Sequence, residues 1–159
     1  MLMKSPKLAL AVATLAFATA GFNWSAQDKD KTLSASEIQK VLDDSKLKYE
    51  TEKDEDDKSV YIIEKDDLRV ILFQYGGEGD TASSVQMRAT FQSEDKPDAK
   101  KLNTWNAERR YTKAYSDEEN NLILEQDLDL AATGSAPALK KFIKEFLAEV
   151  PEFAKEFAD

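Results

Sequence analysis

The stretch VYIIEKDDLRVILFQY, residues 60–75, decides the fold class. Its two halves, 60–64 and 68–75, are rich in β-branched and aromatic side chains, which favour strands. The polar residues 65–67 lie between them and form a short turn. Two such runs joined by a short turn predict a pair of adjacent antiparallel strands.

Further strands are expected on either side of this pair. Residues 47–51 predict a short strand before it, followed by an acidic loop over 52–58. After the glycine-rich loop 76–79, apolar and polar residues alternate over 85–92, which is typical of a strand with one dry and one wet face. Because the links are short, the four consecutive strands predict an antiparallel meander.

A second pair of strands is predicted near the C-terminal end. Residues 111–116 and 122–130 are joined by 117–121, in which Asn120 and Asn121 tolerate the left-handed backbone of a hairpin turn. On the second strand the leucines alternate with acidic residues, so we expect the leucines to face inward and Glu125, Asp127 and Asp129 to face solvent.

Two helices are predicted around the meander. Ser34 and Glu37 have the spacing of a capping box, which places the first helix over 35–44. Pro97 suits the first turn of a second helix, which continues through Trp105.

A third helix completes the order. Gly134 and Ser135 open it, an apolar stripe follows at helical spacing, and Pro151 ends or kinks it. The order α-ββββ-α-ββ-α predicts an α+β domain in which helices pack on an antiparallel sheet. We expect one domain over 32–159, preceded by a flexible lead-in over 21–31.

The N-terminal residues have the pattern of a secretory signal peptide, predicted over residues 1–20. Lys4 and Lys7 precede an apolar run over 8–20, and small residues at 18–20 suit cleavage after Ala20. Cleavage would leave 139 residues and change the net charge from −9 to −11. We therefore expect a bacterial periplasmic or secreted protein without stable membrane insertion. A retained N-terminal anchor is the alternative.

Composition excludes several classes of function. The chain of 159 residues has no His and no Cys, which removes imidazole catalysis, thiol chemistry, disulfides and the usual zinc sites. Lys and Arg number 22 against 31 Asp and Glu, so we expect no nucleic-acid partner. The acidic runs at 28–30 and 54–57 lack the spacing of a calcium loop. We predict no cofactor, no metal and no enzymatic activity.

Two other functions stay open as alternatives. Glu125, Asp127 and Asp129 on one strand face would suit a carboxylate-dependent hydrolase, although a solvated polar strand gives the same pattern. A carrier could instead enclose a small apolar ligand between the sheet and the aromatic side chains of the last helix. Those side chains are Phe142, Phe146, Phe153 and Phe157.

The most distinctive stretch is LNTWN, residues 102–106, followed by Arg109 and Arg110. Trp105 is expected to anchor its helix to the sheet, since a buried Trp contributes a large apolar area. Asn103 and Asn106 are neighbours on the helix surface, where Asn is a poor helix former. Either they hydrogen-bond a neighbouring loop or they belong to a binding surface. The arginines lie at the helix C-terminus, where the helix dipole favours cations.

A family resemblance rests on three segments. LNTWN is followed by RRYTKAY, residues 109–115, and then by LILEQDLDL, residues 122–130. Together they resemble the YbjN-like family of bacterial sensory transduction regulators, and the similarity extends more loosely from Ser34 to about Phe153.

The resemblance implies a fold like that of type III secretion chaperones, which often dimerise, and no catalytic residues. We therefore expect an exported non-enzymatic protein that binds an unknown protein partner in a regulatory or chaperone-like role. A homodimer formed through an open sheet face is a further expectation. Many family members are cytoplasmic, so the export signal is a departure. The candidate binding residues are Asn103, Trp105, Asn106, Arg109, Arg110, Tyr111 and Tyr115.

Overall fold

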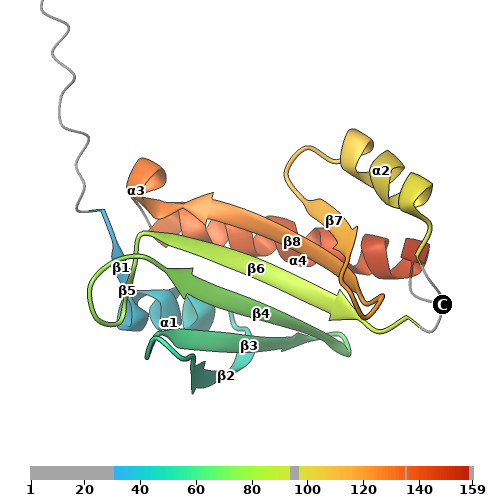
Figure 1. Cartoon of the computed structure of the whole chain (residues 1–159). Helices are drawn as coiled ribbons and strands as arrows, with labels where there is room; N and C mark the ends of the chain where they lie inside the picture. Colours follow the sequence, from blue (N-terminus) through green and yellow to red (C-terminus); the bar gives the residue numbers. More distant parts are fainter. Residues whose placement is uncertain (1–30, 94–96, 135, 158–159) are drawn as a thin grey trace, which may run out of the picture.

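A computed structural model of the chain describes residues 31–93, 97–134 and 136–157. Six antiparallel strands form one sheet in the order β2-β3-β4-β6-β8-β7 (Figure 1). The strands of this sheet are β2 (Lys48–Lys53), β3 (Ser59–Lys65), β4 (Leu68–Tyr75), β6 (Ser84–Phe91), β7 (Lys113–Ser116) and β8 (Leu122–Asp129). The predicted α+β class is confirmed.

The main helices follow the predicted order, and three small elements were not predicted. The larger helices are α1 (Ala35–Asp44), α2 (Ala99–Glu108) and α4 (Ala136–Phe157). The additions are β1 (Leu33–Ser34), β5 (Thr81–Ala82) and α3 (Leu130–Thr133). β1 and β5 pair with each other as a separate small sheet. Elements of two to four residues are too short to give a periodic pattern in the sequence.

The hairpin of β3 and β4 forms as predicted. Lys65 pairs with Leu68, which leaves Asp66 and Asp67 as a two-residue loop. Both have positive φ, 50° and 63°, the backbone that two-residue hairpin loops favour because it matches the twist of the strands. Asp tolerates this left-handed region better than most residues. The sequence therefore encodes the turn as well as the strands.

The second hairpin joins the sheet with its strands in reverse order. β8 pairs with β6 over the full length of both strands, and the four-residue β7 lies at the edge. Asn120 in the connecting turn has φ 66°, as the sequence predicted. The longer strand takes the inner position because it alone can pair with all eight residues of β6.

The two faces of the sheet differ in their cover. α1 and α4 lie behind the sheet in Figure 1, and the core fills the space between them and the strands. Every second residue of each strand points into this core, among them Tyr61, Leu72, Met87 and Leu124. The residues between them point to the opposite face of the sheet. We call it the open face, because α1 and α4 both pack on the core side.

Several predicted boundaries were wrong. β2 continues to Lys53, so the acidic loop begins later than residue 52. Pro97 lies before α2 rather than in its first turn, and Asp98 caps the helix by accepting a hydrogen bond from the backbone N–H of Lys100 (2.8 Å). Gly134 has φ 56° and ends α3 rather than opening the last helix.

The last helix does not end at Pro151. α4 continues to Phe157, with Pro151 inside it. A proline removes one backbone donor from a helix, and this loss favours a break. Here Phe153 is fully buried two residues later, and its packing holds the following turn in the helix. Ser135 and the predicted signal peptide lie outside the described residues.

Candidate partner-binding site

Asn106 fixes α2 to the edge strand of the sheet. Its side-chain amide donates to the carbonyl oxygen of Ala114 (2.8 Å), and its side-chain oxygen accepts from the N–H of the same residue (2.7 Å). The side-chain amide thus satisfies both backbone groups of Ala114, as a neighbouring strand would do at this edge of the sheet. The sequence left open whether the asparagines hydrogen-bond a neighbouring segment or belong to a binding surface. Asn106 hydrogen-bonds the neighbouring strand. Asn103 is exposed on α2.

Trp105 is buried in the core and packs on α4 through its ring. The ring lies 5.2 Å from that of Phe153 and 5.9 Å from that of Phe157, both edge to face. The guanidinium of Arg109 lies over the indole at 4.5 Å from the ring centroid. The aromatic cluster therefore closes the end of the core between α2 and α4.

The residues after α2 are held against α4 by a second contact. Arg109 forms an ion pair with Glu149 of α4 at 3.3 Å. Because Arg109 contacts both Trp105 and Glu149, the backbone at the start of the following segment is held in place. Arg110 is exposed, and its guanidinium lies over the ring of Tyr111 at 5.6 Å. Tyr111 is 67% exposed, more than Tyr75, the other large exposed hydrophobic residue in the described part of the chain.

A cavity of about 300 Å³ adjoins this projecting segment. We call it the Arg–Tyr cleft, and it is lined by Arg109, Arg110, Tyr111, Thr112, Gln126, Glu145, Ala148 and Glu149.

The charges of the Arg–Tyr cleft are nearly balanced within the protein. Glu149 pairs with Arg109, and Glu145 pairs with Lys141 at 2.7 Å. Among the described residues, Arg110 has no ion-pair partner. The cleft therefore offers one free guanidinium, next to an exposed aromatic ring.

Tyr115 belongs to a different surface. It lies on the open face, where its hydroxyl donates to a carboxylate oxygen of Glu125 at 2.8 Å. Arg88 lies 3.2 Å from the same carboxylate, and Lys113 contacts its other oxygen. The seven residues predicted from the sequence therefore do not form one site. Arg109, Arg110 and Tyr111 line the Arg–Tyr cleft, and Trp105 and Asn106 anchor the segment that carries them. Asn103 is exposed on α2, and Tyr115 supports a separate ion cluster.

The ion cluster corrects the predicted exposure of Glu125, which is only 3% exposed. The strand parity was predicted correctly, but the side chains of Arg88, Lys113 and Tyr115 cover the carboxylate. Burial by itself would raise the pKa of Glu125. The hydrogen bonds from Lys113 and Tyr115 and the charges of Lys113 and Arg88 outweigh it, so the pKa is lowered. Conversely, the bond to Glu125 raises the pKa of Lys113.

The other two carboxylates of the proposed hydrolase have structural contacts. Asp127 is exposed and accepts from the side-chain amide of Gln86 (2.9 Å). Asp129 caps α3 by accepting from the N–H of Ala132 (3.1 Å). A general acid needs a raised pKa, whereas the pKa of Glu125 is lowered. The geometry gives no support to a catalytic trio.

Residues 34–159 match the sequence profile of the YbjN family, described as "Putative bacterial sensory transduction regulator". This chain belongs to the YbjN family. The match covers most of the sequence and confirms the resemblance based on the LNTWN segment and the two strands after it. A search of curated proteins found no match. The family description names a regulatory role and no enzymatic activity.

The cleft of this YbjN-family chain contains residues that the sequence did not indicate. Gln126 comes from β8, and Glu145, Ala148 and Glu149 come from α4. They meet the segment after α2 only through the tertiary fold. The i, i+4 spacing of Lys141 and Glu145 was the one local signal for an ion pair there.

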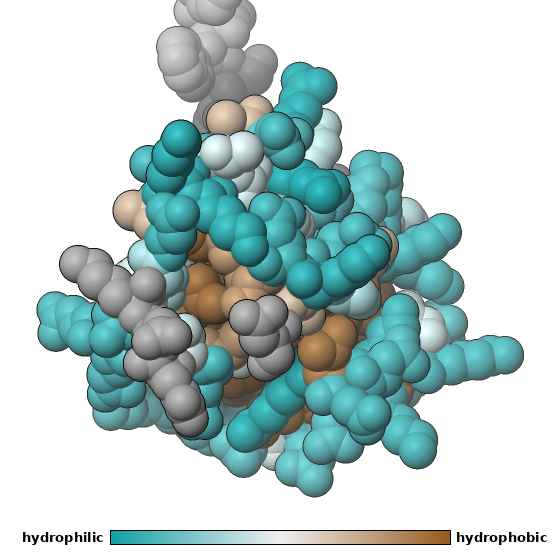
Figure 2. Space-filling view, turned by 90° about the vertical axis from the view of Figure 1, so that its right-hand side faces the viewer, coloured by the Kyte–Doolittle hydropathy of each residue, from teal (hydrophilic) through white to brown (hydrophobic). Residues whose placement is uncertain are grey.

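The phenylalanines proposed to hold an apolar ligand are mostly core. Phe142, Phe146 and Phe153 are buried, and Phe153 stacks on Phe157 with ring centroids 4.6 Å apart. Figure 2 looks onto this end of the molecule and shows an apolar area ringed by hydrophilic residues. Phe142 and Phe146 are buried in the core, and Phe153 and Phe157 contact each other, so these side chains contribute packing rather than an open ligand chamber.

The described part of the chain has neither a membrane-spanning helix nor a cluster of metal-ligating side chains. No helix there is long and apolar enough to cross a membrane. No group of three or more acidic side chains in the same part of the chain is arranged to hold a metal ion.

Proposed function

We propose that this protein is an exported regulator that acts by binding a partner protein at the Arg–Tyr cleft, without catalysis. The observation that carries the proposal is Tyr111, which projects at 67% exposure beside two arginines and above the cleft. Tyr and Arg are over-represented among the residues that contribute most to protein–protein binding. The regulatory role is consistent with the family description.

The surface is arranged to bind at low entropic cost. Arg109 is held between Trp105 and Glu149, and the bonds of Asn106 to Ala114 tie the end of α2 to β7. A segment fixed at both ends loses little freedom on binding, which favours affinity.

The chemistry of the surface indicates what the partner presents. Arg110 has no ion-pair partner in the described residues, and a guanidinium binds a carboxylate through paired hydrogen bonds. Tyr111 adds apolar area, and the adjoining cleft of about 300 Å³ can accept a side chain. We infer a partner that presents a carboxylate next to an apolar side chain.

Export is part of the proposal and rests on the N-terminal sequence. The basic residues Lys4 and Lys7, the apolar run after them and the small residues before position 21 support cleavage after Ala20. The regulator would then meet its partner in the periplasm or outside the cell.

Affinity capture from the periplasmic fraction tests the binding surface. Tagged wild type is compared with Tyr111→Ser and with Tyr75→Ser, which changes the other large exposed tyrosine among the described residues. We expect at least one protein to be retained by wild type and Tyr75→Ser, and to be lost with Tyr111→Ser. Losing a central hot-spot side chain costs about 2 kcal/mol or more, roughly a 30-fold loss of affinity. Equal capture by all three proteins would refute the assigned surface.

A further inference from the structure

A second cavity, of about 310 Å³, lies where the turn after α1, the end of β3 and helix α4 meet. Four lysines line it, Lys46, Lys65, Lys140 and Lys144, with Asp44 as the acidic residue. We call it the lysine cleft. In a chain with 31 acidic and 22 basic residues, this local excess of positive charge runs against the overall balance.

The four lysines outnumber the carboxylate of the cleft, Asp44, while Glu64, Asp66 and Asp67 line the adjoining cavity. None of the four lysines forms an ion pair within residues 31–93, 97–134 and 136–157. The ammonium group of Lys140 lies 3.5 Å from the carbonyl oxygen of Asp44, a contact with a backbone dipole rather than a charge.

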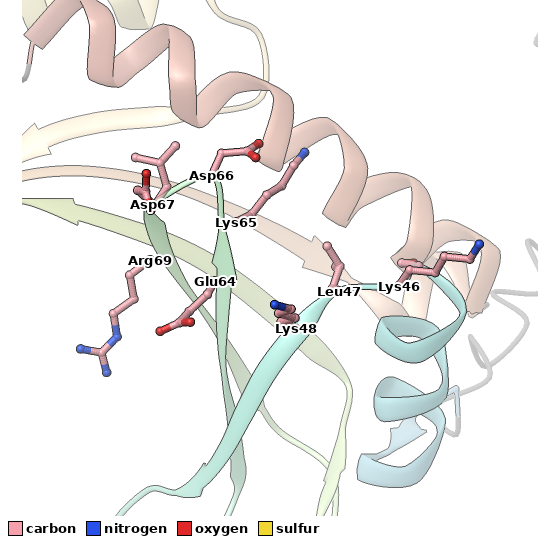
Figure 3. Close-up of a pocket in the computed structure, with 10 residues that line it drawn as sticks. Lys46, Leu47, Lys48, Glu64, Lys65, Asp66, Asp67 and Arg69 are labelled. Atoms are coloured by element: carbon pink, nitrogen blue, oxygen red, sulfur yellow. The ribbon is translucent and has the colours of Figure 1, made fainter.

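The wall between the lysines is aliphatic. Ile143 and Leu147 of α4 are buried members of the core, and Leu47 is half-buried against it. In Figure 3 the side chains of Leu47 and Lys65 extend from the ends of β2 and β3 toward α4. The figure shows the adjoining cavity of about 790 Å³, which shares Lys46, Leu47 and Lys65 with the lysine cleft.

A cleft in which charges of one sign predominate beside apolar walls concentrates its electric field and attracts ions of the opposite sign. Ligand sites typically combine an apolar lining with a few charged groups, and their volumes begin near 300 Å³. Lysine supplies a compact positive charge rather than a planar fork, so it selects for charge more than for the shape of the anion.

We propose that the lysine cleft binds a small anionic amphiphile, with its anionic head group among the four lysines and an aliphatic tail against the half-buried Leu47. The volume suits a single short chain. This inference goes beyond the proposed function, because the lysine cleft is separate from the Arg–Tyr cleft.

The separation follows from the geometry of α4. Residues 140, 143, 144 and 147 repeat at helical spacing on one side of the helix. Residues 145, 148 and 149 line the Arg–Tyr cleft, and a rotation of about 100° per residue places them on a different side. Each site can therefore be altered without changing the other.

Titration calorimetry with decanoate, decyl phosphate and decyltrimethylammonium tests the proposal on the purified protein, below micelle-forming concentrations. We expect the two anions to bind and the cation not to bind. Whichever anion binds more tightly identifies the preferred head group, carboxylate or phosphate. The double change Lys140→Gln, Lys144→Gln is expected to weaken anion binding about tenfold or more, since each lost charge removes attraction in a partly enclosed site.

Lys141→Gln is the matched control, because Lys141 lies on α4 between the two lysines but pairs with Glu145 instead. It should leave anion binding unchanged. Leu47→Gln keeps every charge and should weaken the binding of decanoate through the tail. The inference is overturned if neither anion binds at millimolar concentration, if the cation binds equally well, or if Lys141→Gln weakens binding as much as the double change.

Discussion

Glu125 remains charged although it is nearly buried, because Arg88, Lys113 and Tyr115 surround its carboxylate. We predict that Glu125→Gln lowers the free energy of unfolding at pH 7 by about 2 kcal/mol, the typical size for hydrogen bonds to a charged group. Asp127→Asn, on the same face but exposed, should change it by less than about 0.5 kcal/mol. Urea unfolding of the three proteins checks this.

The effect of Glu125→Gln should depend on pH. The folded pKa of Glu125 lies below its ordinary value of 4.5, so its contribution is complete above pH 4.5 and is lost as pH falls through the folded pKa. The difference between wild type and Glu125→Gln should therefore shrink in acid. A difference of constant size from pH 7 down to pH 2 would mean that the charge of Glu125 does not stabilise the fold.

The two asparagines of the LNTWN segment form a natural pair of test and control. Asn106→Ala removes both bonds to Ala114 and leaves the edge of β7 without that partner. We expect it to reduce the free energy of unfolding by about 1–3 kcal/mol. Asn103→Ala, at an exposed position of the same helix, should be neutral or slightly stabilising. Thermal unfolding of the two variants checks this. Equal decreases in their melting temperatures would contradict the assigned role of Asn106.

At the scale of elements, α2 is held by the aromatic contact of Trp105 with Phe153 of α4. We predict that Trp105→Phe and Phe153→Leu, combined in a double-mutant cycle, show a coupling of about 1 kcal/mol. Urea unfolding of wild type, the single variants and the double variant gives this value. Strict additivity would show that the two rings stabilise their helices independently.

The elements with a strong local pattern could be predicted, and those that depend on distant contacts could not. Ser34 and Glu37 form the predicted capping box, and the β3–β4 turn forms where the two aspartates follow each other. Pro151 left two outcomes open, an end or a kink, and the helix continues because the packing of Phe153 on α2 and β6 outweighs the local preference for a break. The inner position of β8 likewise depends on its pairing with β6.

The same limit applies to the candidate site. The sequence indicated the residues from Asn103 to Tyr111, because an unusual composition marks them. It grouped Tyr115 with them, but strand alternation places that side chain on the open face. Glu149 is 40 positions from Arg109 in the chain, so no local pattern could reveal their contact.

For the whole molecule, export predicts a processed N-terminus. Intact-mass measurement on the periplasmic fraction should find a chain of 139 residues that begins at Gly21. The full-length mass in a membrane fraction would instead support the retained anchor. Homodimerisation through the open face stays a prediction, and sedimentation equilibrium of the processed chain tests it.

Site-specific photocrosslinking in living cells tests the central claim most directly. A photoreactive phenylalanine analogue replaces Tyr111 in one strain and Tyr75 in another, since both side chains are exposed. We predict a discrete crosslinked product from position 111 that is absent from position 75 and is lost when Arg110 is changed to Ser. No product from position 111, or the same products from both positions, would contradict binding at the Arg–Tyr cleft.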